Sequence, residues 1–281
     1  MKRYKLLNNV LGWVVFVIAA VTYILTLEST ASFWDCGEFI ASGYKLEVGH
    51  PPGNPIFMLT ARFFANFASS PSEVAYMVNL MSGLLSAATI LLLFWTITRL
   101  AQKIVLREGE TEETMSLGQM IAILGCGLVG ALAYTFSDTF WFSAVEGEVY
   151  AFSSFLTALV FWMILRWQDE SDTVYGDRWI ILIAYIIGLS IGVHLLNLLC
   201  IPAIVLVFYY QKYRTISLKG AIAAIALSGL LIVLILFVYI PGMADIGGWF
   251  ELLFVNALGF PFQTGLIIFL TLVLSLLIGA I

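Results

Sequence analysis

The first apolar run of the chain covers residues 11–27 and reads LGWVVFVIAAVTYILTL. A spanning helix needs about 20 residues to cross about 30 Å of hydrocarbon, so a run of this length is typical of a membrane helix. Basic residues precede it at Lys2, Arg3 and Lys5, as in a signal peptide, but no A-x-A cleavage site follows it. We therefore interpret residues 11–27 as a retained first transmembrane helix.

The rest of the chain repeats this pattern. Of its 281 residues, 61% are hydrophobic and 11% are charged, with a mean hydropathy of +0.99, a composition that excludes a soluble domain and a disordered chain. Further apolar runs fall at about 74–100, 118–137, 149–166, 179–193, 195–210, 217–240 and 262–281. The sequence predicts an all-α, polytopic transmembrane helical bundle of roughly eight segments.

The stretch between Arg178 and Arg214 is too long for one span, since a single helix would measure about 50 Å. Two short spans that turn near residues 192–197 would return both basic ends to one side of the membrane, as the positive-inside rule requires. This places His194 and Asn197 at the turn, on the opposite side.

Basic residues also predict the orientation of the whole bundle. With a cytoplasmic N-terminus, eleven Lys or Arg lie inside and only Lys45 and Arg62 lie outside. Residues 28–73, 138–148 and 241–261 then face the periplasm or lumen. A net charge of −5 without a dense basic patch argues against a nucleic-acid partner.

The last apolar run, 262–281, ends without a basic anchor. We therefore treat residues 1–281 as one transmembrane domain and expect the natural chain to continue beyond it. Two of the three cysteines lie in apolar runs and only Cys36 lies in a polar stretch, so no disulfide pair is predicted.

The first outer loop, residues 28–73, is far longer than a helix connection needs. Asp35 can begin a short helix over 36–45, and Asn54 with Pro55 can begin a second over 55–67. The second carries apolar residues at helical spacing, which predicts that it lies in the membrane interface. The two helices are joined by His50-Pro51-Pro52-Gly53.

Two carboxylates of this loop are the candidate catalytic groups. Asp35 and Glu38 are three residues apart, so a helix starting there places both on one face. A carboxylate at a membrane mouth can act as a general base. The same spacing also fits a capping box, in which Asp35 and Glu38 only satisfy backbone N–H groups.

Three cations or donors of the loop are candidates for phosphate binding: His50, Lys45 and Arg62. The alternatives are a solvated turn for His50 and snorkelling toward lipid headgroups for Lys45 and Arg62.

Four residues of later segments complete the candidate substrate site: Glu146, Glu148, His194 and Asn197. The alternative for Glu146 and Glu148 is a place at a helix N-terminus, where carboxylates interact favourably with the helix dipole. The alternative for His194 is a hydrogen bond that packs two helices together. A divalent metal on Asp35, Glu38, His50, Glu146 or His194 is chemically feasible, although no ligand spacing demands one.

An acidic pair after the first span, followed by His-Pro-Pro at the far end of a helical outer loop, resembles the protein O-mannosyltransferases and their GT-C-type relatives. FWDCGEFIASGYKLEVGHPPGNP at 33–55, EGEVYAF at 146–152 and GLSIGVHLLNLL at 188–199 are closer still to the transmembrane protein 260 family and its bacterial homologues. In the O-mannosyltransferases the two acidic residues are adjacent, whereas Cys36 and Gly37 separate them here.

This resemblance implies a GT-C-like membrane glycosyltransferase. Its donor would be a polyprenyl-phosphate-linked sugar, mannose being one candidate, and its acceptor a hydroxyl of protein Ser/Thr or glycan, attacked with inversion on the periplasmic or lumenal face. Asp35, or in second place Glu38, would activate the acceptor. The alternatives are a transporter or flippase for a lipid-linked or small anionic substrate, and a scaffold. The concentration of ionisable residues at the outer edge rather than mid-span argues against transport.

Overall fold

The computed structural model describes residues 3–51, 53–213 and 215–279, so Pro52 of the predicted turn and Lys2 and Arg214 of the orientation argument lie outside the described residues. Within these ranges the chain is all-α and contains no strand, which confirms the predicted class. It forms two compact units, Met1–Arg214 and Thr215–Ile281.

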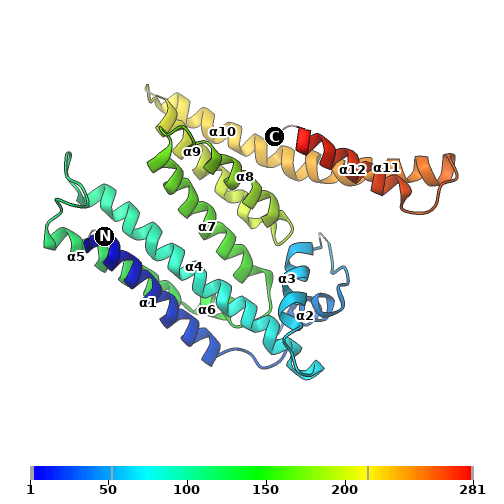
Figure 1. The fold of residues 1–281 in the computed structure, drawn as a ribbon, viewed down its shortest axis with the longest axis horizontal. Coiled ribbons are helices and arrows are strands. Elements are labelled where there is room, and N and C mark those ends of the chain that lie inside the picture. The colour runs from blue at the N-terminus through cyan, green and yellow to red at the C-terminus, as the bar shows by residue number, and fades with distance from the viewer. Residues whose placement is uncertain (1–2, 52, 214, 280–281) are drawn as a thin grey trace. The chain divides into compact units, whose positions relative to one another are not determined.

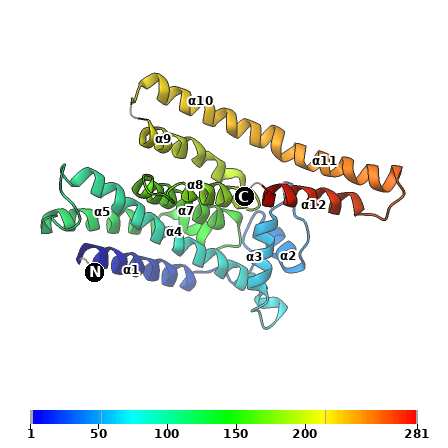
Figure 2. The ribbon, with the colours of Figure 1, turned by 45° about the horizontal axis from the view of Figure 1, so that its top comes forward.

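The first unit is a helical bundle built around one long helix. α4 (Val74–Val105) packs against α1 (Arg3–Leu25), α5 (Leu117–Thr135) and α7 (Val149–Glu170), which lie beside it in Figures 1 and 2. Small buried residues of α4, Ser82, Gly83, Ser86 and Ala87, allow the neighbouring backbones to approach closely, as is usual in membrane bundles.

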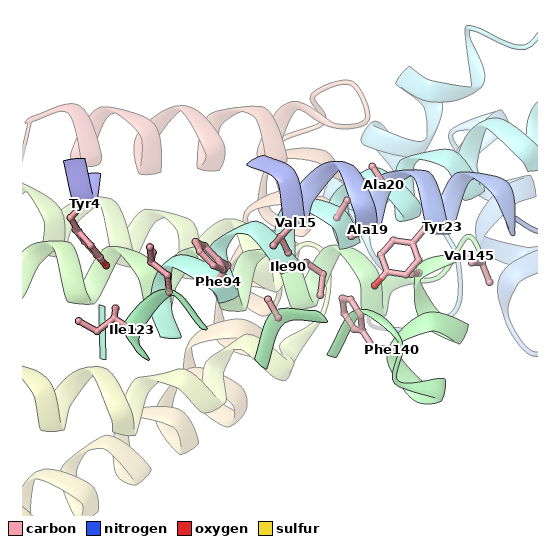
Figure 3. Close-up of a cluster of buried hydrophobic side chains, with 14 of the residues drawn as sticks. Tyr4, Val15, Ala19, Ala20, Tyr23, Ile90, Phe94, Ile123, Phe140 and Val145 are labelled. Carbon is pink, nitrogen blue, oxygen red and sulfur yellow. The ribbon is translucent and has the colours of Figure 1, made fainter. Parts of the chain in front are cut away.

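Apolar side chains from α1, α4, α5 and the short helix α6 (Asp138–Ala144) fill the space between these helices, as Figure 3 shows. Near the C-terminal end of α1, the Tyr23 ring meets Phe140 edge-on with centroids 6.2 Å apart, and its hydroxyl donates to the Thr135 carbonyl at 3.1 Å. The buried hydroxyl is thus satisfied, which fixes α1 against α5.

The predicted hairpin of residues 178–214 is confirmed. α8 (Arg178–Ile191) ends at Gly192, and a 3₁₀ segment, η2 (Leu195–Cys200), leads into α9 (Ile201–Lys212). Lys212 Nζ lies 3.5 Å from Asp177 Oδ1, so the start of α8 and the end of α9 are neighbours.

The two helices of the first outer loop are also confirmed. α2 (Cys36–Lys45) and α3 (Pro55–Ala65) pack against each other and against α4, and a 3₁₀ turn, η1 (Pro71–Glu73), precedes α4. Figure 1 shows them beside the start of α4, at the end of the bundle away from α1's N-terminus.

Six helices of the described chain are long and apolar enough to cross a membrane: Arg3–Leu25, Pro71–Val105, Leu117–Thr135, Val149–Glu170, Leu195–Lys212 and Leu218–Ala257. The other two predicted segments form shorter apolar helices, α8 with 14 residues and α12 (Thr264–Gly279) with 16. The chain is an integral membrane protein.

In the second unit, residues 241–257 are helical, which corrects the prediction of a loop over 241–261. α10 (Leu218–Leu234) continues through a π-helical segment, η3 (Ile235–Tyr239), into α11 (Ile240–Leu252) and a second π segment, η4 (Leu253–Ala257), before α12 packs back on α11. The Ile240 N–H bonds to the Ile235 carbonyl five residues back. This wider turn accommodates Pro241, which would otherwise kink or end the helix.

Candidate active site in the first outer loop

The start of the loop is held by α4. The buried Asn79 amide donates to the carbonyls of Glu28 and Thr30 at 2.7 and 3.0 Å. The Glu28 N–H in turn donates to the Val145 carbonyl at 3.1 Å. These bonds fix the chain just after α1 and just before α7, so that Asp35 emerges beside the residues 146–148.

The core under the loop is apolar. Phe39 and Ile40 of α2 and Phe57 and Met58 of α3 pack with Val78 of α4 in one buried cluster. The α2 and α3 backbones come close at Gly43, where an added Cβ would lie 2.8 Å from the Ala61 Cβ. α2 and α3 are therefore a fixed platform.

Asp35, Glu38 and His50 come together on the exposed side of this platform. The atoms through which they could bind a ligand all lie within 4.8 Å of one another. Glu38 Oε1 accepts the His50 backbone N–H at 2.6 Å, and His50 Nδ1 lies 3.1 Å from Glu38 Oε2. The chain turns back between them through Leu46, whose φ is 56°.

The capping-box interpretation of this pair is wrong. Asp35 precedes α2, but its side chain makes no cap hydrogen bond, and Glu38 bonds forward to His50 rather than back to the helix start. The tertiary contact with His50 replaces the local one. Asp35 is left exposed with its carboxylate outside the helix cap.

Hydrogen bonding sets the protonation states of Glu38 and His50. The His50 backbone N–H, followed by its ring, lowers the pKa of Glu38. The bond to Glu38 raises the pKa of His50, and the charges of Glu38, Asp35 and Glu148 act in the same direction. The pair therefore favours an ionised carboxylate beside an imidazolium.

Glu146 and Glu148 lie behind Asp35, buried at 4% and 5% exposure. Cys36 Sγ lies 3.8 Å from Glu148 Oε1. Burial, then the charge of Glu146, raises the pKa of Glu148 to about 7, and burial also raises that of Glu146. The Cys36 thiol, desolvated beside both, has a raised pKa as well.

The backbone between the two glutamates leaves little room for a side chain at Gly147. A Cβ on Gly147 would lie 3.0 Å from Asn79 Oδ1 and 3.1 Å from side-chain atoms of Ile40 and Val78. The Glu-Gly-Glu spacing thus lets the 146–148 segment press against α2 and α4. The interpretation of the two carboxylates as N-terminal helix charges describes only Glu148, which precedes α7 without a side-chain cap bond.

Arg62 and Lys45 already have partners. Arg62 donates from Nη1 to the Tyr44 carbonyl and stacks over the Tyr44 ring, 5.2 Å from its centroid. Lys45 Nζ lies 3.9 Å from Glu47 Oε1 and is largely exposed. Arg62 therefore braces α3 against the end of α2, and Lys45 is the more accessible cation.

The α8–η2 turn is hydrogen-bonded to the start of α3. The Ile56 N–H donates to the Gly192 carbonyl at 2.8 Å. With its amide oriented to satisfy its neighbours, Asn54 donates to the Val193 carbonyl at 2.9 Å. These bonds join the start of α3 to a turn more than 130 residues later in the chain, a contact that the sequence did not reveal.

The two candidates of this turn differ in their surroundings. His194 is half-buried against the Tyr150 ring, with centroids 5.5 Å apart, and its Nδ1 accepts the Leu196 N–H. Asn197 is fully buried, and its Oδ1 lies near Thr157 Oγ1 and Cys200 Sγ, at 3.4 and 3.2 Å. Asn197 thus joins α7 to η2, and none of its hydrogen bonds goes to Asp35, Glu38 or His50.

Sequence patterns also missed a residue in an unusual backbone conformation, directly before Asp35. Trp34 has a φ of 61°, in a region that non-glycine residues rarely occupy. Trp34 is 89% exposed, and the preceding Phe33 is 81% exposed. Two exposed aromatic side chains before Asp35 suit the interface between lipid and water.

Comparison with known proteins gives a consistent result. Residues 35–217 match the family described as the protein O-mannosyl-transferase TMEM260 N-terminal domain. Protein O-mannosyl-transferase TMEM260 of Mus musculus is 29% identical over 231 residues, covering 81% of this chain and 29% of the mouse protein. The tmem260 protein of Dictyostelium discoideum, with the same description, is 22% identical over 202 residues, covering 69% of this chain and 22% of its own length.

The chain thus spans less than a third of the length of these relatives. The search of solved structures gave no significant match. The matched family segment begins at Asp35, extends through the α8–η2 turn and covers well over half of the chain. The chain belongs to the TMEM260 N-terminal domain family.

Proposed function

We propose that this chain is the membrane part of a glycosyltransferase that moves mannose from a polyprenyl-phosphate donor to a hydroxyl of a protein acceptor. The observation that carries the proposal is the convergence of Asp35, Glu38 and His50 within 4.8 Å at the exposed mouth of the first loop. The printed names of the relatives, protein O-mannosyl-transferases, support the sugar and the acceptor.

Asp35 is the proposed general base. Its carboxylate is exposed and is not used in the helix cap, whereas Glu38 is engaged by His50 through two hydrogen-bonding groups. The acceptor oxygen attacks the anomeric carbon, its proton passes to Asp35, and the bond from that carbon to the phosphate oxygen breaks. Attack opposite the leaving phosphate inverts the anomeric configuration.

The leaving phosphate needs little more than a neighbouring positive charge. His50, whose pKa is raised by its bond to Glu38, and the exposed Lys45 are the proposed partners. Arg62 uses one of its five N–H donors on the Tyr44 carbonyl, and we propose it as a further partner of the phosphate through the others. His194, at the turn docked on α3, is a further proposed donor to the substrate.

Glu146 and Glu148 are proposed to support Asp35 from the buried side of the site. They contact Cys36, the residue that follows Asp35. Burial favours a protonated Glu148. We assign them to holding the base in place, and we assign Asn197, buried between α7 and η2, to holding the turn.

The proposed site faces the periplasm or lumen, and the N-terminus lies in the cytoplasm. Basic residues gather at the far end of the bundle, where Arg99 pairs with Asp169 and Arg166 with Glu170. This distribution supports that orientation under the positive-inside rule.

A divalent cation could be bound by the two carboxylates of Asp35 and Glu38 and the imidazole of His50. Such an ion would neutralise the donor phosphate. It would have to replace the existing bonds between Glu38 and His50, so we propose a mechanism in which hydrogen bonds alone order the cluster.

The test is transfer of radiolabelled mannose from polyprenyl-phosphate mannose to endogenous membrane acceptors, using the full-length protein. Because a general base contributes about 100- to 10,000-fold, Asp35→Asn should reduce kcat in that range. Glu38→Gln should reduce kcat less, because Glu38 positions His50 and does not accept the proton. Asp138→Asn, which changes an exposed carboxylate at the start of α6 that has no proposed role, is the matched control.

Unchanged transfer by Asp35→Asn would refute its role as base. Loss of transfer in Glu38→Gln with Asp35→Asn active would move that role to Glu38. No transfer by the wild type from any polyprenyl-phosphate sugar would refute the enzyme proposal.

A further inference from the structure

Two side chains lie together where α7 begins and α8 ends, each with a polar atom that no other group of the described chain uses. The Tyr150 ring lies against the His194 ring, with centroids 5.5 Å apart. Among the described residues, no hydrogen bond involves the Tyr150 hydroxyl or His194 Nε2. Tyr150 is 47% exposed, and His194 Nε2 keeps accessible surface. A ligand can therefore reach both side chains.

Hydrogen bonding fixes the position of the proton on the His194 ring. Nδ1 accepts the Leu196 N–H at 3.1 Å, so Nδ1 carries no proton and the neutral ring carries its proton on Nε2. Burial lowers the pKa of His194, which keeps the ring neutral at pH 7. The Nε2–H group is therefore an uncharged hydrogen-bond donor.

The backbone around His194 is held in place before any ligand binds. The His194 N–H donates to the Ser190 carbonyl at 2.8 Å. The preceding residue, Val193, is fully buried, and its carbonyl accepts the Asn54 amide at 2.9 Å. Val193 also packs with Val149 of α7 in the apolar cluster under α2 and α3. A donor fixed in this way loses little conformational entropy when a ligand binds.

The connections of Tyr150 lead to the proposed base. Tyr150 follows Glu148 by two positions, and the Glu148 carboxylate lies 3.8 Å from Cys36 Sγ. Cys36 directly follows Asp35. An extended polypeptide advances about 3.3–3.6 Å per residue, so one whose hydroxyl lies at Asp35 would reach Tyr150 within about five residues.

The chemistry of the two groups favours a peptide over the donor phosphate. Phosphate is bound most strongly by charged donors, whereas Tyr150 and His194 are both uncharged. A peptide group offers one C=O acceptor and one N–H donor. The His194 Nε2–H and the oxygen of the Tyr150 hydroxyl are complementary to these two groups.

We propose that Tyr150 and His194 bind the backbone of the acceptor polypeptide, a few residues from the hydroxyl that receives the sugar. The His194 Nε2–H donates to a peptide carbonyl, and the Tyr150 hydroxyl accepts a peptide N–H. This inference rests on the proposed function and names the residues that hold its protein acceptor.

The test compares two threonine acceptors on the full-length protein. One is a fluorescently labelled peptide of about twelve residues, long enough to extend from Asp35 past Tyr150, and the other is N-acetylthreonine amide. Tyr150→Phe should weaken binding of the peptide, measured by fluorescence anisotropy, about three- to tenfold. It should raise KM for the peptide by the same factor and leave KM for N-acetylthreonine amide and for the mannose donor unchanged. Tyr175→Phe, which changes an exposed tyrosine between α7 and α8, is the matched control and should bind the peptide as the wild type does.

Two variants of His194 separate a role in binding from a role in structure. The Oδ1 of Asn can replace Nδ1 as the acceptor of the Leu196 N–H, whereas the Nε2–H of Gln can replace the donor. His194→Asn should therefore weaken peptide binding about as much as Tyr150→Phe does, and His194→Gln should retain most of it. The reverse order would show that His194 only caps η2 and would overturn its role as a donor.

Wild-type affinity for the peptide in both Tyr150→Phe and His194→Asn would overturn the inference and leave the proposed transfer reaction intact. A raised KM for the mannose donor alone would also overturn it, because the pair would then contact the sugar. Peptide binding that depends on both residues, in a protein that transfers no mannose, would support the peptide site and refute the proposed reaction.

Discussion

Glu148→Gln should stabilise the protein at alkaline pH and have little effect at acidic pH. Glu148 is 5% exposed, and burial with the charge of Glu146 raises its pKa from 4.5 to about 7. A raised carboxyl pKa means that the folded state binds the proton more tightly than the unfolded state. The stability that protonation provides is complete below pH 4.5 and is lost as the pH rises through about 7.

The magnitude follows from the same values. A tenfold change in proton affinity is about 1.4 kcal/mol, so the wild type should lose about 3 kcal/mol between pH 5 and pH 9 through this one group. Gln keeps a neutral side chain of the same shape and should remove most of that loss. Neighbouring Glu146, whose pKa is also raised, leaves a smaller pH dependence in the variant.

Thermal unfolding of the purified protein in detergent, recorded by tryptophan fluorescence from pH 5 to pH 9, measures this effect. The Glu148→Gln curve should meet the wild-type curve near pH 5 and lie above it at pH 9, while Glu47→Gln follows the wild type throughout. Parallel curves for Glu148→Gln and wild type would show that Glu148 is solvated and would refute the buried carboxyl.

Three further outcomes are expected. Gly147→Ala should destabilise the fold by about 1–3 kcal/mol, because the added Cβ would lie 3.0 Å from Asn79. Gly188→Ala is the control and should not destabilise the fold, because no atom lies within 4 Å of its added Cβ. Equal unfolding temperatures of the two variants would contradict the close packing at Gly147. Hydrogen-exchange protection of the His50 amide should be greatest between pH 4.5 and 6.5. Glu38, whose pKa is lowered, is ionised above pH 4.5, and His50, whose pKa is raised, is charged below pH 6.5. Protection that rises steadily to pH 9 would contradict the pairing of Glu38 with His50. EDTA should leave mannose transfer within about twofold if hydrogen bonds alone order the cluster, and transfer that is lost and then restored by added divalent cation would assign the cluster to a metal.

Much of the fold could be predicted because the bilayer imposes long apolar helices. The two loop helices could also be predicted, because Asp35, Asn54 and Pro55 mark where they begin. The pairing of Glu38 with His50 could not, since a spacing of three residues looks the same in a capping box and only the turn through Leu46 selects the tertiary partner.

Two other features depend on contacts distant in sequence. Cys36 and Glu148 are 112 positions apart, and no local pattern joins them. Pro241 predicts the end of a helix, yet the π turn before it lets the helix continue. The catalytic candidates were thus identifiable by residue type, but their hydrogen-bond partners were not.

The bonds from Asn54 and Ile56 to the α8–η2 turn also set an order for biogenesis. A ribosome adds about 5–20 residues per second, so the first outer loop waits roughly 7 to 27 s before the Gly192 and Val193 carbonyls exist. Until then, the exposed face of α3 is open to chaperones and to the translocation machinery. The loop that begins the site is therefore among its last parts to be completed, and a nascent chain halted before Gly192 cannot close it.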